Sequence, residues 1–320
     1  MYFKGVKPKV IVICGPTALG KTSTAIHLAK HFDGEIIGAD SMQIYKYMDI
    51  GTAKPTLDEQ ARVRHHMIDF IDPDEHFDAR KYAILSREKV IKLHGQKIIP
   101  FVVGGTGLYM KALFHGLFKT EASDSDIRGR LKAEAQARGS AYLYKRLCRQ
   151  DPDTAKKIHP NDTYRIMRAL EVYALTGKTL AELHQAHGFK DSPFVVLKIG
   201  LHIHREMLYD RINKRVEIMI NSGFVNEVKQ LLTMGYSPEL KSMQSIGYRH
   251  IVNFLEGHLT WDETVRTLKR DTRRYAKRQM TWFKADPEVI WQEPEALEDI
   301  KGLIKKFLQG DKDISISKES

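Results

Sequence analysis

The sequence predicts an α/β fold in which a parallel sheet is flanked by helices and an all-helical domain is inserted into the chain. Apolar β-branched runs alternate with segments of helical spacing, and a Gly-x4-Gly-Lys-Thr motif at 15–22 lies between the first run and the first such segment. From about Lys119 to Pro193 the β-branched runs give way to Ala, Arg, Lys and Leu, which predicts the insert. We expect a discontinuous P-loop NTPase-like core at 1–118 and 195–310, a helical insert at 119–194 and a disordered tail at 311–320.

The motif at 15–22 is typical of a phosphate-binding loop. It follows the strand-like run Val10–Cys14 and precedes a helix-like segment at 23–31, which is the context that phosphate binding requires. Glycines let backbone N–H groups converge on phosphate oxygens, the helix N-terminus and Lys21 add positive charge, and the Thr22 hydroxyl can ligate Mg²⁺. The alternative is an ordinary glycine turn. The predicted phosphate-binding residues are Gly15, Pro16, Thr17, Ala18, Leu19, Gly20, Lys21 and Thr22.

An acidic residue is predicted at the same edge of the sheet. Gly34–Ala39 has the pattern of a second strand, so Asp40 follows it at the end where the phosphate loop follows the first strand. The third predicted strand, 97–103, is followed by glycines at 104–107, where a nucleotide hydrolase usually has an aspartate that holds Mg²⁺. We therefore interpret the phosphate loop as binding a diphosphate without nucleotide hydrolysis, beside Asp40. The alternative for Asp40 is a turn cap formed with Ser41.

Further elements continue the pattern in both parts of the chain. A helix is predicted at 77–93, and in the insert an amphipathic helix at 166–175 opens after the N-cap segment 161–165. The run 195–203 is a strand, and the helix that starts at Arg205 has an apolar face formed by Leu208, Ile212, Val216 and Met219. Arg211 and Arg215 lie on a neighbouring face of that helix. Either can clamp a diphosphate, and we assign Arg211; a solvated helix face is the alternative.

A basic segment at 266–284 carries eight Lys or Arg residues and one Asp. Arg266, Arg270, Arg273 and Lys277 recur at helical spacing, and aromatic residues that can stack on bases interleave with them. A merely solvated helix face would normally mix both signs of charge. The segment is therefore predicted to bind a phosphate backbone. A short strand at 289–291 and a helix to about 308 follow it.

Composition agrees with a globular protein that binds a polyanion. The 320 residues are 42% apolar, and the net charge of +11 with a pI near 9.4 makes nucleic acid the usual candidate partner. There is no apolar run of membrane-spanning length and no signal-peptide pattern, so we expect a cytoplasmic protein without a membrane partner. Cys14 and Cys148 have neither disulfide-framework nor metal-site spacing. A monomer is expected.

Taken together, the motifs resemble the tRNA dimethylallyltransferases (tRNA isopentenyltransferases) over nearly the whole chain. Several motifs in one order are far more specific than a single one. A bacterial type is implied, because eukaryotic relatives often append a zinc finger and this chain has no Cys/His pattern for one. The segments that carry the resemblance are Gly15–Ser23, Asp40–Tyr45, Met48–Pro55, Gly104–Tyr109, His159–Asp162 with Arg165, Arg168–Val172 and Lys277–Trp282.

The resemblance implies transfer of a dimethylallyl group from dimethylallyl diphosphate to the exocyclic amino group of the tRNA adenosine next to the anticodon on its 3′ side, with release of diphosphate. It implies that Asp40 is the base, that Lys21 and Thr17 also take part in catalysis, and that Mg²⁺ binds at Thr22. The adenosine would be flipped out, with the insert closing on the anticodon arm. The implied tRNA contacts are Asp40, Ser41, Met42, Gln43, Thr106, Arg128, Tyr164, Arg165, Ile166, Met167, Arg168, Gln244, Ser245, Ile246, Gly247, Tyr248, Arg249, Lys277, Arg278, Gln279, Met280, Thr281, Trp282, Phe283 and Lys284.

Three other functions are consistent with parts of the pattern. A related enzyme that prenylates free adenine nucleotides shares the phosphate loop and the aspartate, but it does not need the basic segment. A P-loop small-molecule kinase would transfer phosphate from ATP and needs no RNA surface. A non-enzymatic RNA-binding protein with a vestigial loop would not need the intact Lys21 and Thr22.

Overall fold

The computed structural model describes residues 6–117, 125–188 and 192–310. The chain splits into two compact units, one formed by Met1–Phe114 with Ser192–Ser320 and the other by His115–Asp191. The sequence-based division at 119 and 194 lies a few residues from these limits. The predicted tail at 311–320 lies outside the described residues. Within the described ranges, no helix combines the length and apolar character that a membrane crossing needs.

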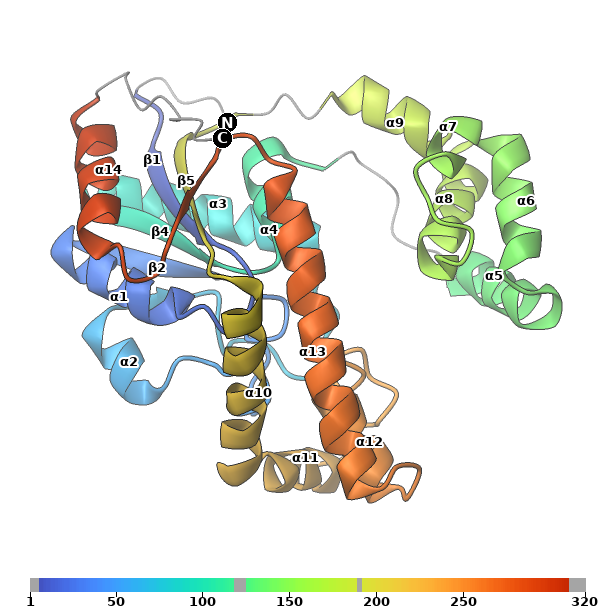
Figure 1. Ribbon diagram of the computed structural model, residues 1–320. Helices are drawn as coiled ribbons and strands as arrows, with labels where there is room; N and C mark the ends of the chain where they lie inside the picture. The colour runs from blue at the N-terminus through green and yellow to red at the C-terminus, as the bar shows by residue number, and fades with distance from the viewer. Residues whose placement is uncertain (1–5, 118–124, 189–191, 311–320) are drawn as a thin grey trace. The chain divides into compact units, whose positions relative to one another are not determined.

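The first unit is built on a parallel six-stranded sheet with strand order β3-β2-β4-β1-β5-β6, most of which is visible in Figure 1. The central strands β1, β4 and β5 are buried along most of their length, which explains why they are continuous apolar runs. Because β2, β4 and β1 are neighbours, the loops that follow them lie side by side. The strands are β1 (Lys9–Cys14), β2 (Gly34–Ala39), β3 (His65–His66), β4 (Ile99–Gly104), β5 (Val195–Leu201) and β6 (Val289–Gln292).

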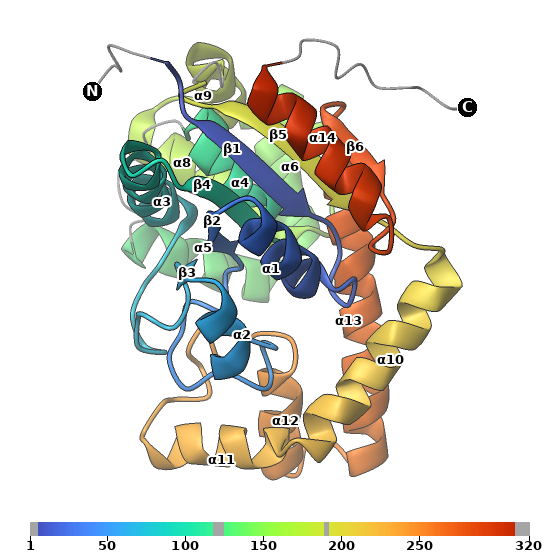
Figure 2. The same cartoon turned by 90° about the vertical axis from the view of Figure 1, so that its left-hand side faces the viewer.

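Helices cover both faces of the sheet (Figure 2). On one face, Leu28 of α1 and Ile304 of α14 join Ile11 and Ile13 of β1 in one core cluster. On the other face α3 and α4 pack together, with the rings of Tyr82 and Tyr109 stacked at 4.2 Å between centroids. The helices around the sheet are α1 (Lys21–His31), α2 (Leu57–Arg62), α3 (Ala79–Gly95), α4 (Gly107–His115) and α14 (Leu297–Gln309).

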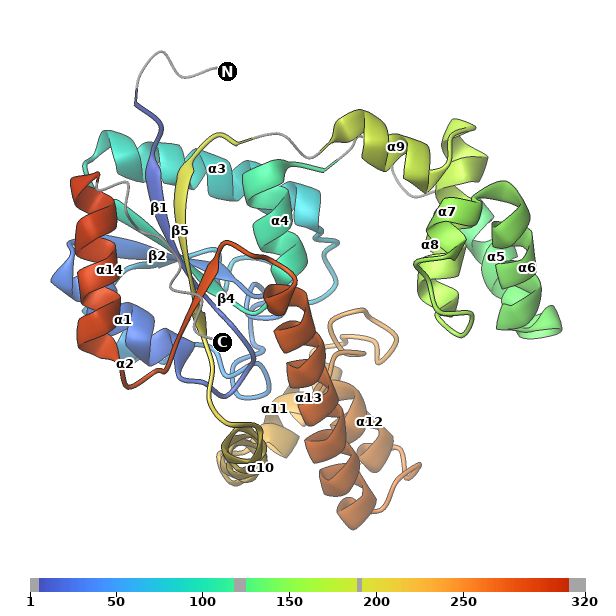
Figure 3. The ribbon, with the colours of Figure 1, turned by 45° about the horizontal axis from the view of Figure 1, so that its top comes forward.

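Four helices between β5 and β6 extend beyond the sheet, with α10 and α13 side by side and α11 and α12 connecting their far ends (Figures 2 and 3). The longest, α13, has 24 residues and begins at a capping box in which Thr260 accepts from the Glu263 N–H. These helices are α10 (Arg205–Asn221), α11 (Phe224–Thr233), α12 (Tyr248–Leu255) and α13 (Trp261–Lys284).

The second unit is helical and has a core of its own. Leu143, Leu147, Ile166 and Leu170 are almost fully buried in it. Its helices are α5 (Ser125–Arg138), α6 (Ser140–Gln150), α7 (Pro152–Ala155), α8 (Thr163–Thr176) and α9 (Leu180–His187).

The predicted fold class is confirmed, and the strand predicted at 34–39 has the bounds of β2. The sequence does not predict β3, because its two residues carry no periodic pattern and form a strand only through pairing with Ile36 and Ile37.

Candidate active site

The phosphate loop connects β1 to α1 through backbone conformations that its sequence permits. Gly15 has φ +134°, and a Cβ at this position would lie 2.7 Å from the Leu201 carbonyl oxygen, so only glycine fits beside β5. Gly20 has φ +74° and forms the N-cap of α1. The loop therefore presents the N-terminus of α1, with Lys21 and Thr22 in its first turn, to the cavity described below.

Lys21 is held inside this loop. Its ammonium group donates to the Pro16 carbonyl oxygen at 2.6 Å. Removal from solvent and the nearby positive charge of Arg215 lower the pKa of Lys21 to about 8, and the Asp40 charge opposes this shift only in part. The Lys21 side chain is therefore charged below about pH 8 and loses its charge above it.

This pKa predicts an alkaline limit to binding of the diphosphate that the sequence predicts for this loop. Because an uncharged Lys21 cannot attract a diphosphate, kcat/KM for a diphosphate substrate should fall about tenfold per pH unit above about pH 8. Initial rates from pH 6 to 10 measure this limb. In Lys21→Arg the cation keeps its charge over this range. The value of kcat/KM should be lower than in the parent at neutral pH, but its decline near pH 8 should disappear. An unchanged limb in that variant would assign the titration to another group.

Asp40 follows β2 and has two roles. One carboxylate oxygen, Oδ1, accepts from the backbone N–H groups of Met42 and Gln43 at 2.8 and 3.3 Å, so the residue does cap a turn. Asp40 also lines both cavities of the site. The turn fixes the direction of the carboxylate, and the two interpretations made from the sequence are therefore compatible.

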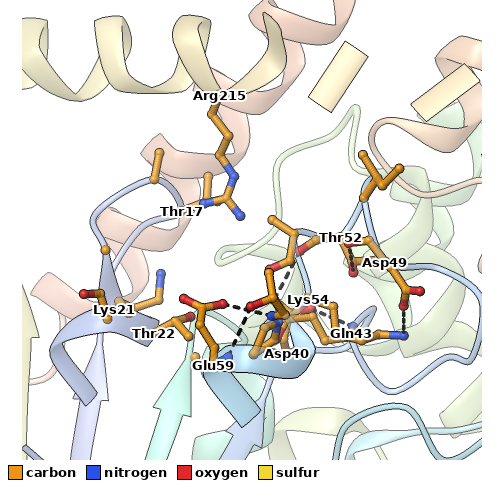
Figure 4. Close-up of a pocket in the computed structure, with 18 of the residues that line it drawn as sticks. Thr17, Lys21, Thr22, Asp40, Gln43, Asp49, Thr52, Lys54, Glu59 and Arg215 are labelled. Carbon is orange, nitrogen blue, oxygen red and sulfur yellow. Dashed lines mark hydrogen bonds and ion pairs between the residues drawn. The ribbon is translucent and has the colours of Figure 1, made fainter. Parts of the chain in front are cut away.

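Two cavities, of about 690 and 320 Å³, meet at the carboxyl ends of the strands. The larger lies over the phosphate loop and extends to α2; the smaller lies between α10, α13 and residues 244–249. Figure 4 shows the Arg215 side chain extending from α10 toward Thr17, with Lys21 and Asp40 below. We call the shared wall the junction; it is formed by Thr17, Asp40, Thr52, Arg215, Met219 and Tyr275.

The structure does not place Arg211, which the sequence analysis assigned to the diphosphate, at the phosphate loop. Arg211 lines neither cavity and pairs with Glu295 at 2.9 Å. Arg215, four residues later on α10, lines both cavities. Burial lowers the pKa of Arg215, and within the described part of the chain its guanidinium has no hydrogen bond or ion pair. The helix turns Arg215 inward beside Val216, while Arg211 points toward the segment that precedes α14.

The glycines at the end of β4 and just after it accommodate neighbouring segments. Gly104, the last residue of β4, pairs with Ala39 at the end of β2, and a Cβ at Gly104 would lie 2.1 Å from the Ala39 carbonyl oxygen. A Cβ at Gly105 or Gly107 would lie 2.0 Å from Gln279 Nε2 or Trp282 Nε1 of α13. Glycines, and not the aspartate of a nucleotide hydrolase, therefore stand at 105 and 107 because α13 packs against them.

Comparison with known proteins decides the family. A family model described as IPP transferase matches residues 43–286, more than half of the chain. The chain belongs to this family. It is 55% identical over 304 residues to the tRNA dimethylallyltransferase of Desulfosudis oleivorans, covering 95% of this chain and 97% of that protein. It is 52% identical to tRNA dimethylallyltransferase 2 of Syntrophus aciditrophicus, with 95% and 98% covered.

Solved structures agree with this assignment to the IPP transferase family. The full-length tRNA isopentenylpyrophosphate transferase from Bacillus halodurans is 40% identical, with a TM-score of 0.71 and coverage of 95% of this chain and 97% of that one. A eukaryotic dimethylallyltransferase acting on tRNA is 30% identical, with a TM-score of 0.79 and coverage of 94% and 80%. The family indicated by the sequence motifs is confirmed.

Several residues carried over from the family motifs as tRNA contacts have buried side chains. Tyr248 and Ile166 are 0% exposed and Phe283 is 4% exposed. Tyr248 packs on Phe224, and Ile166 belongs to the core of the insert. A motif copied as a continuous run includes both faces of a helix, and only one face meets solvent. Ile166 and Phe283 are therefore packing residues in this structure, while the buried Tyr248 also lines the smaller cavity.

Several basic side chains of the segment at 266–284 already have partners within the protein. Asp271 lies within ion-pair distance of Arg249, Arg270 and Arg274. Although burial opposes the shift, Arg270, Arg249 and His250 lower the pKa of Asp271 to about 2. Arg273 donates to Asn213 of α10 at 2.7 Å. Charged side chains of this segment therefore help to hold α13 against α12, through Asp271 and Arg249, and against α10, through Arg273.

Other basic side chains of α13 remain exposed, namely Arg266, Lys277, Arg278 and Lys284. Arg278 also lines the smaller cavity and lies over the Tyr275 ring at 5.7 Å. Gln244, Ser245, Ile246, Gly247 and Arg249 line the same cavity, and Ser41 and Met42 do so from the opposite loop. The structure thus brings these predicted contacts together around one opening.

In the insert, a buried carboxylate positions two of the predicted arginines. Glu171 is 1% exposed, and its Oε2 accepts from Arg128 at 3.1 Å and from Arg168 at 2.9 Å. Tyr164 is 72% exposed at the start of α8, where Arg165 pairs with Asp162. Arg128 and Arg168 therefore share one buried partner that fixes their positions.

Two charged residues that were not singled out from the sequence hold the loop at 49–54, which lines the larger cavity. Glu227 of α11 accepts from the backbone N–H groups of Asp49, Ile50 and Gly51 at 2.7–3.0 Å, and from the Tyr248 hydroxyl. Lys54 is buried and donates to Asp49, Asp69 and the Tyr45 carbonyl oxygen. A signal existed for Glu227, because this charge interrupts the buried face of α11.

Proposed function

We propose that this chain transfers a dimethylallyl group from dimethylallyl diphosphate to the exocyclic amino group of the tRNA adenosine on the 3′ side of the anticodon, and releases diphosphate. The observation that carries the proposal is the junction, where a phosphate loop, a carboxylate and an arginine meet between two cavities. The names of the relatives, tRNA dimethylallyltransferases at 55% and 52% identity, support it. In this reading the donor occupies the larger cavity and the adenine the smaller one.

The chemistry needs a base at the amine and positive charge at the leaving group. The exocyclic amine forms a bond to the first carbon of the dimethylallyl group while the carbon–oxygen bond to diphosphate breaks. Asp40 takes a proton from that amine, whose lone pair is otherwise delocalised into the ring. Lys21, Arg215 and the loop N–H groups stabilise the negative charge that develops on diphosphate. Negative charge thus moves toward the phosphate loop.

We propose Mg²⁺ as the cofactor, held through Thr22. Thr22 lines the larger cavity at the start of α1, and Mg²⁺ commonly takes few protein ligands and completes its shell with phosphate oxygens and water. The described residues include no group of three or more His, Cys, Asp or Glu side chains that could hold a metal. When bound, the ion would neutralise part of the diphosphate charge.

The decisive experiment supplies unmodified tRNA and dimethylallyl diphosphate together and detects the product nucleoside by mass. A prenylated adenosine in tRNA, and none when adenosine monophosphate replaces tRNA, is the expected result. Product with adenosine monophosphate alone would instead indicate the free-nucleotide enzyme. Phosphate transfer from ATP to a small molecule, without prenylation, would indicate a kinase.

The exposed cations of α13 predict how tRNA affinity depends on salt. Lys277 and Lys284 are exposed and line neither cavity. The double variant Lys277→Gln/Lys284→Gln should bind tRNA several-fold more weakly, with the slope of log K against log salt reduced by roughly one unit per lost phosphate contact. The matched control is Lys305→Gln/Lys306→Gln on α14, which removes two exposed charges elsewhere and should leave the slope unchanged. Equal slopes in both double variants would make α13 a solvated face only.

A further inference from the structure

One amide of α13 is directed into the loops that follow β1 and β4, and its residue, Gln279, also lines the larger cavity. Gln279 is 5% exposed. Its Oε1 accepts from the Thr17 backbone N–H at 2.9 Å, and its Nε2 donates to the Gly105 carbonyl oxygen at 3.0 Å. Both polar ends of the side chain are therefore engaged with loop backbone, as a buried amide requires.

The surroundings are shaped for this amide. A Cβ at Gly105 would lie 2.0 Å from Gln279 Nε2, so a side chain at position 105 would displace it. One turn earlier on α13, Tyr275 lies close to Thr106 and Gln279. Thr106 in turn accepts from the Ser41 backbone N–H at 3.1 Å. The loops that follow β1, β2 and β4 are thus all connected to one face of α13.

The contact to Thr17 matters most, because Thr17 belongs to the junction of the two cavities. In a phosphate loop the direction of each peptide N–H decides which of them face the ligand. The Thr17 N–H donates to Gln279, and this hydrogen bond fixes the orientation of the peptide group and of the Thr17 side chain next to it.

We propose that Gln279 is a positioning residue that holds the phosphate loop at Thr17 in its binding conformation, and not a tRNA contact. The role in donor binding rests on the proposed function; the contact to the loop does not. The family motif groups Gln279 with its exposed neighbours Lys277 and Arg278 as an RNA-binding run. The hydrogen bonds separate it from them, because its amide is directed to the opposite side of α13.

The first test is amide hydrogen exchange, which needs no substrate. Gln279→Met keeps the volume and loses both hydrogen bonds, so the Thr17 amide should exchange at least about tenfold faster. Gln279→Glu keeps the acceptor for Thr17 and should stay close to the parent at that amide. Gln230→Met, on the exposed side of α11, is the matched control and should leave the exchange rate of the Thr17 amide unchanged. The same Thr17 exchange rate in Gln279→Met and the parent would overturn the proposal.

The second test separates the two substrates. Gln279→Met should raise the Kd for inorganic diphosphate and the KM for dimethylallyl diphosphate about tenfold, with the Kd for tRNA within about twofold of the parent. A weakened Kd for tRNA with unchanged diphosphate binding would make Gln279 an RNA contact and overturn the proposal. If Gln279→Met does not fold, Gln279→Asn, whose shorter side chain should not reach Thr17, takes its place. If no prenyl transfer is found at all, the proposed function fails, while exchange and diphosphate binding still decide the role of Gln279.

Discussion

Replacing Asp40 by asparagine is expected to lower kcat by a factor of about 10² to 10⁴. Asparagine retains an oxygen that can accept from the Met42 and Gln43 N–H groups, so the turn after β2 should persist. It lacks the proton affinity that the attacking amine requires. The Kd values for tRNA and dimethylallyl diphosphate should therefore stay within about threefold of the parent while the rate of single-turnover transfer falls.

Asp58→Asn is the matched control, because Asp58 is an exposed aspartate of α2 that lines neither cavity. Its kcat should equal that of the parent. A loss below about tenfold in Asp40→Asn would reduce Asp40 to the turn cap that its hydrogen bonds also describe. A large rise in both Kd values would instead indicate that the loop had collapsed.

The parts of the fold that were predicted correctly are those whose signal is local. The glycines of 15–22, the β-branched runs of β1, β2 and β4, and the spacing in α10 each depend on residues close in sequence. Parallel pairing then places the ends of β1, β2 and β4 at one edge. The two-residue β3 has no such signal, because its conformation comes from pairing with β2.

The parts of the site that were not predicted depend on contacts between distant segments. Spacing could not decide whether Arg211 or Arg215 faces the cavity, since both lie beside the apolar face of α10. Gly105 and Gly107 are explained by Gln279 and Trp282, more than 170 residues later in the chain. Glu227 likewise acts on a loop that precedes it by about as many residues. The sequence indicated phosphate binding and a carboxylate. The packing of α11 and α13 decides which other side chains contact the loops around the cavities.

Arg215, the arginine that lines both cavities, gives the second large prediction. Arg215→Gln should weaken binding of inorganic diphosphate about 10- to 100-fold, because it removes a charge-assisted contact from a partly buried site. Arg211→Gln should change that affinity by less than about twofold, since it removes only an exposed pair with Glu295. Isothermal titration with diphosphate measures both. The reverse order of the two variants would restore Arg211 as the clamp.

The same variant has a second, independent consequence at Lys21. The positive charge of Arg215 is one of the causes that lower the pKa of Lys21 to about 8, so its removal should raise that pKa. In Arg215→Gln the alkaline limb of kcat/KM should therefore move to higher pH, although the maximum value is lower. In Arg211→Gln the limb should stay near pH 8. A limb that does not move in Arg215→Gln would mean that the two cations do not interact, and that they do not act together on one diphosphate.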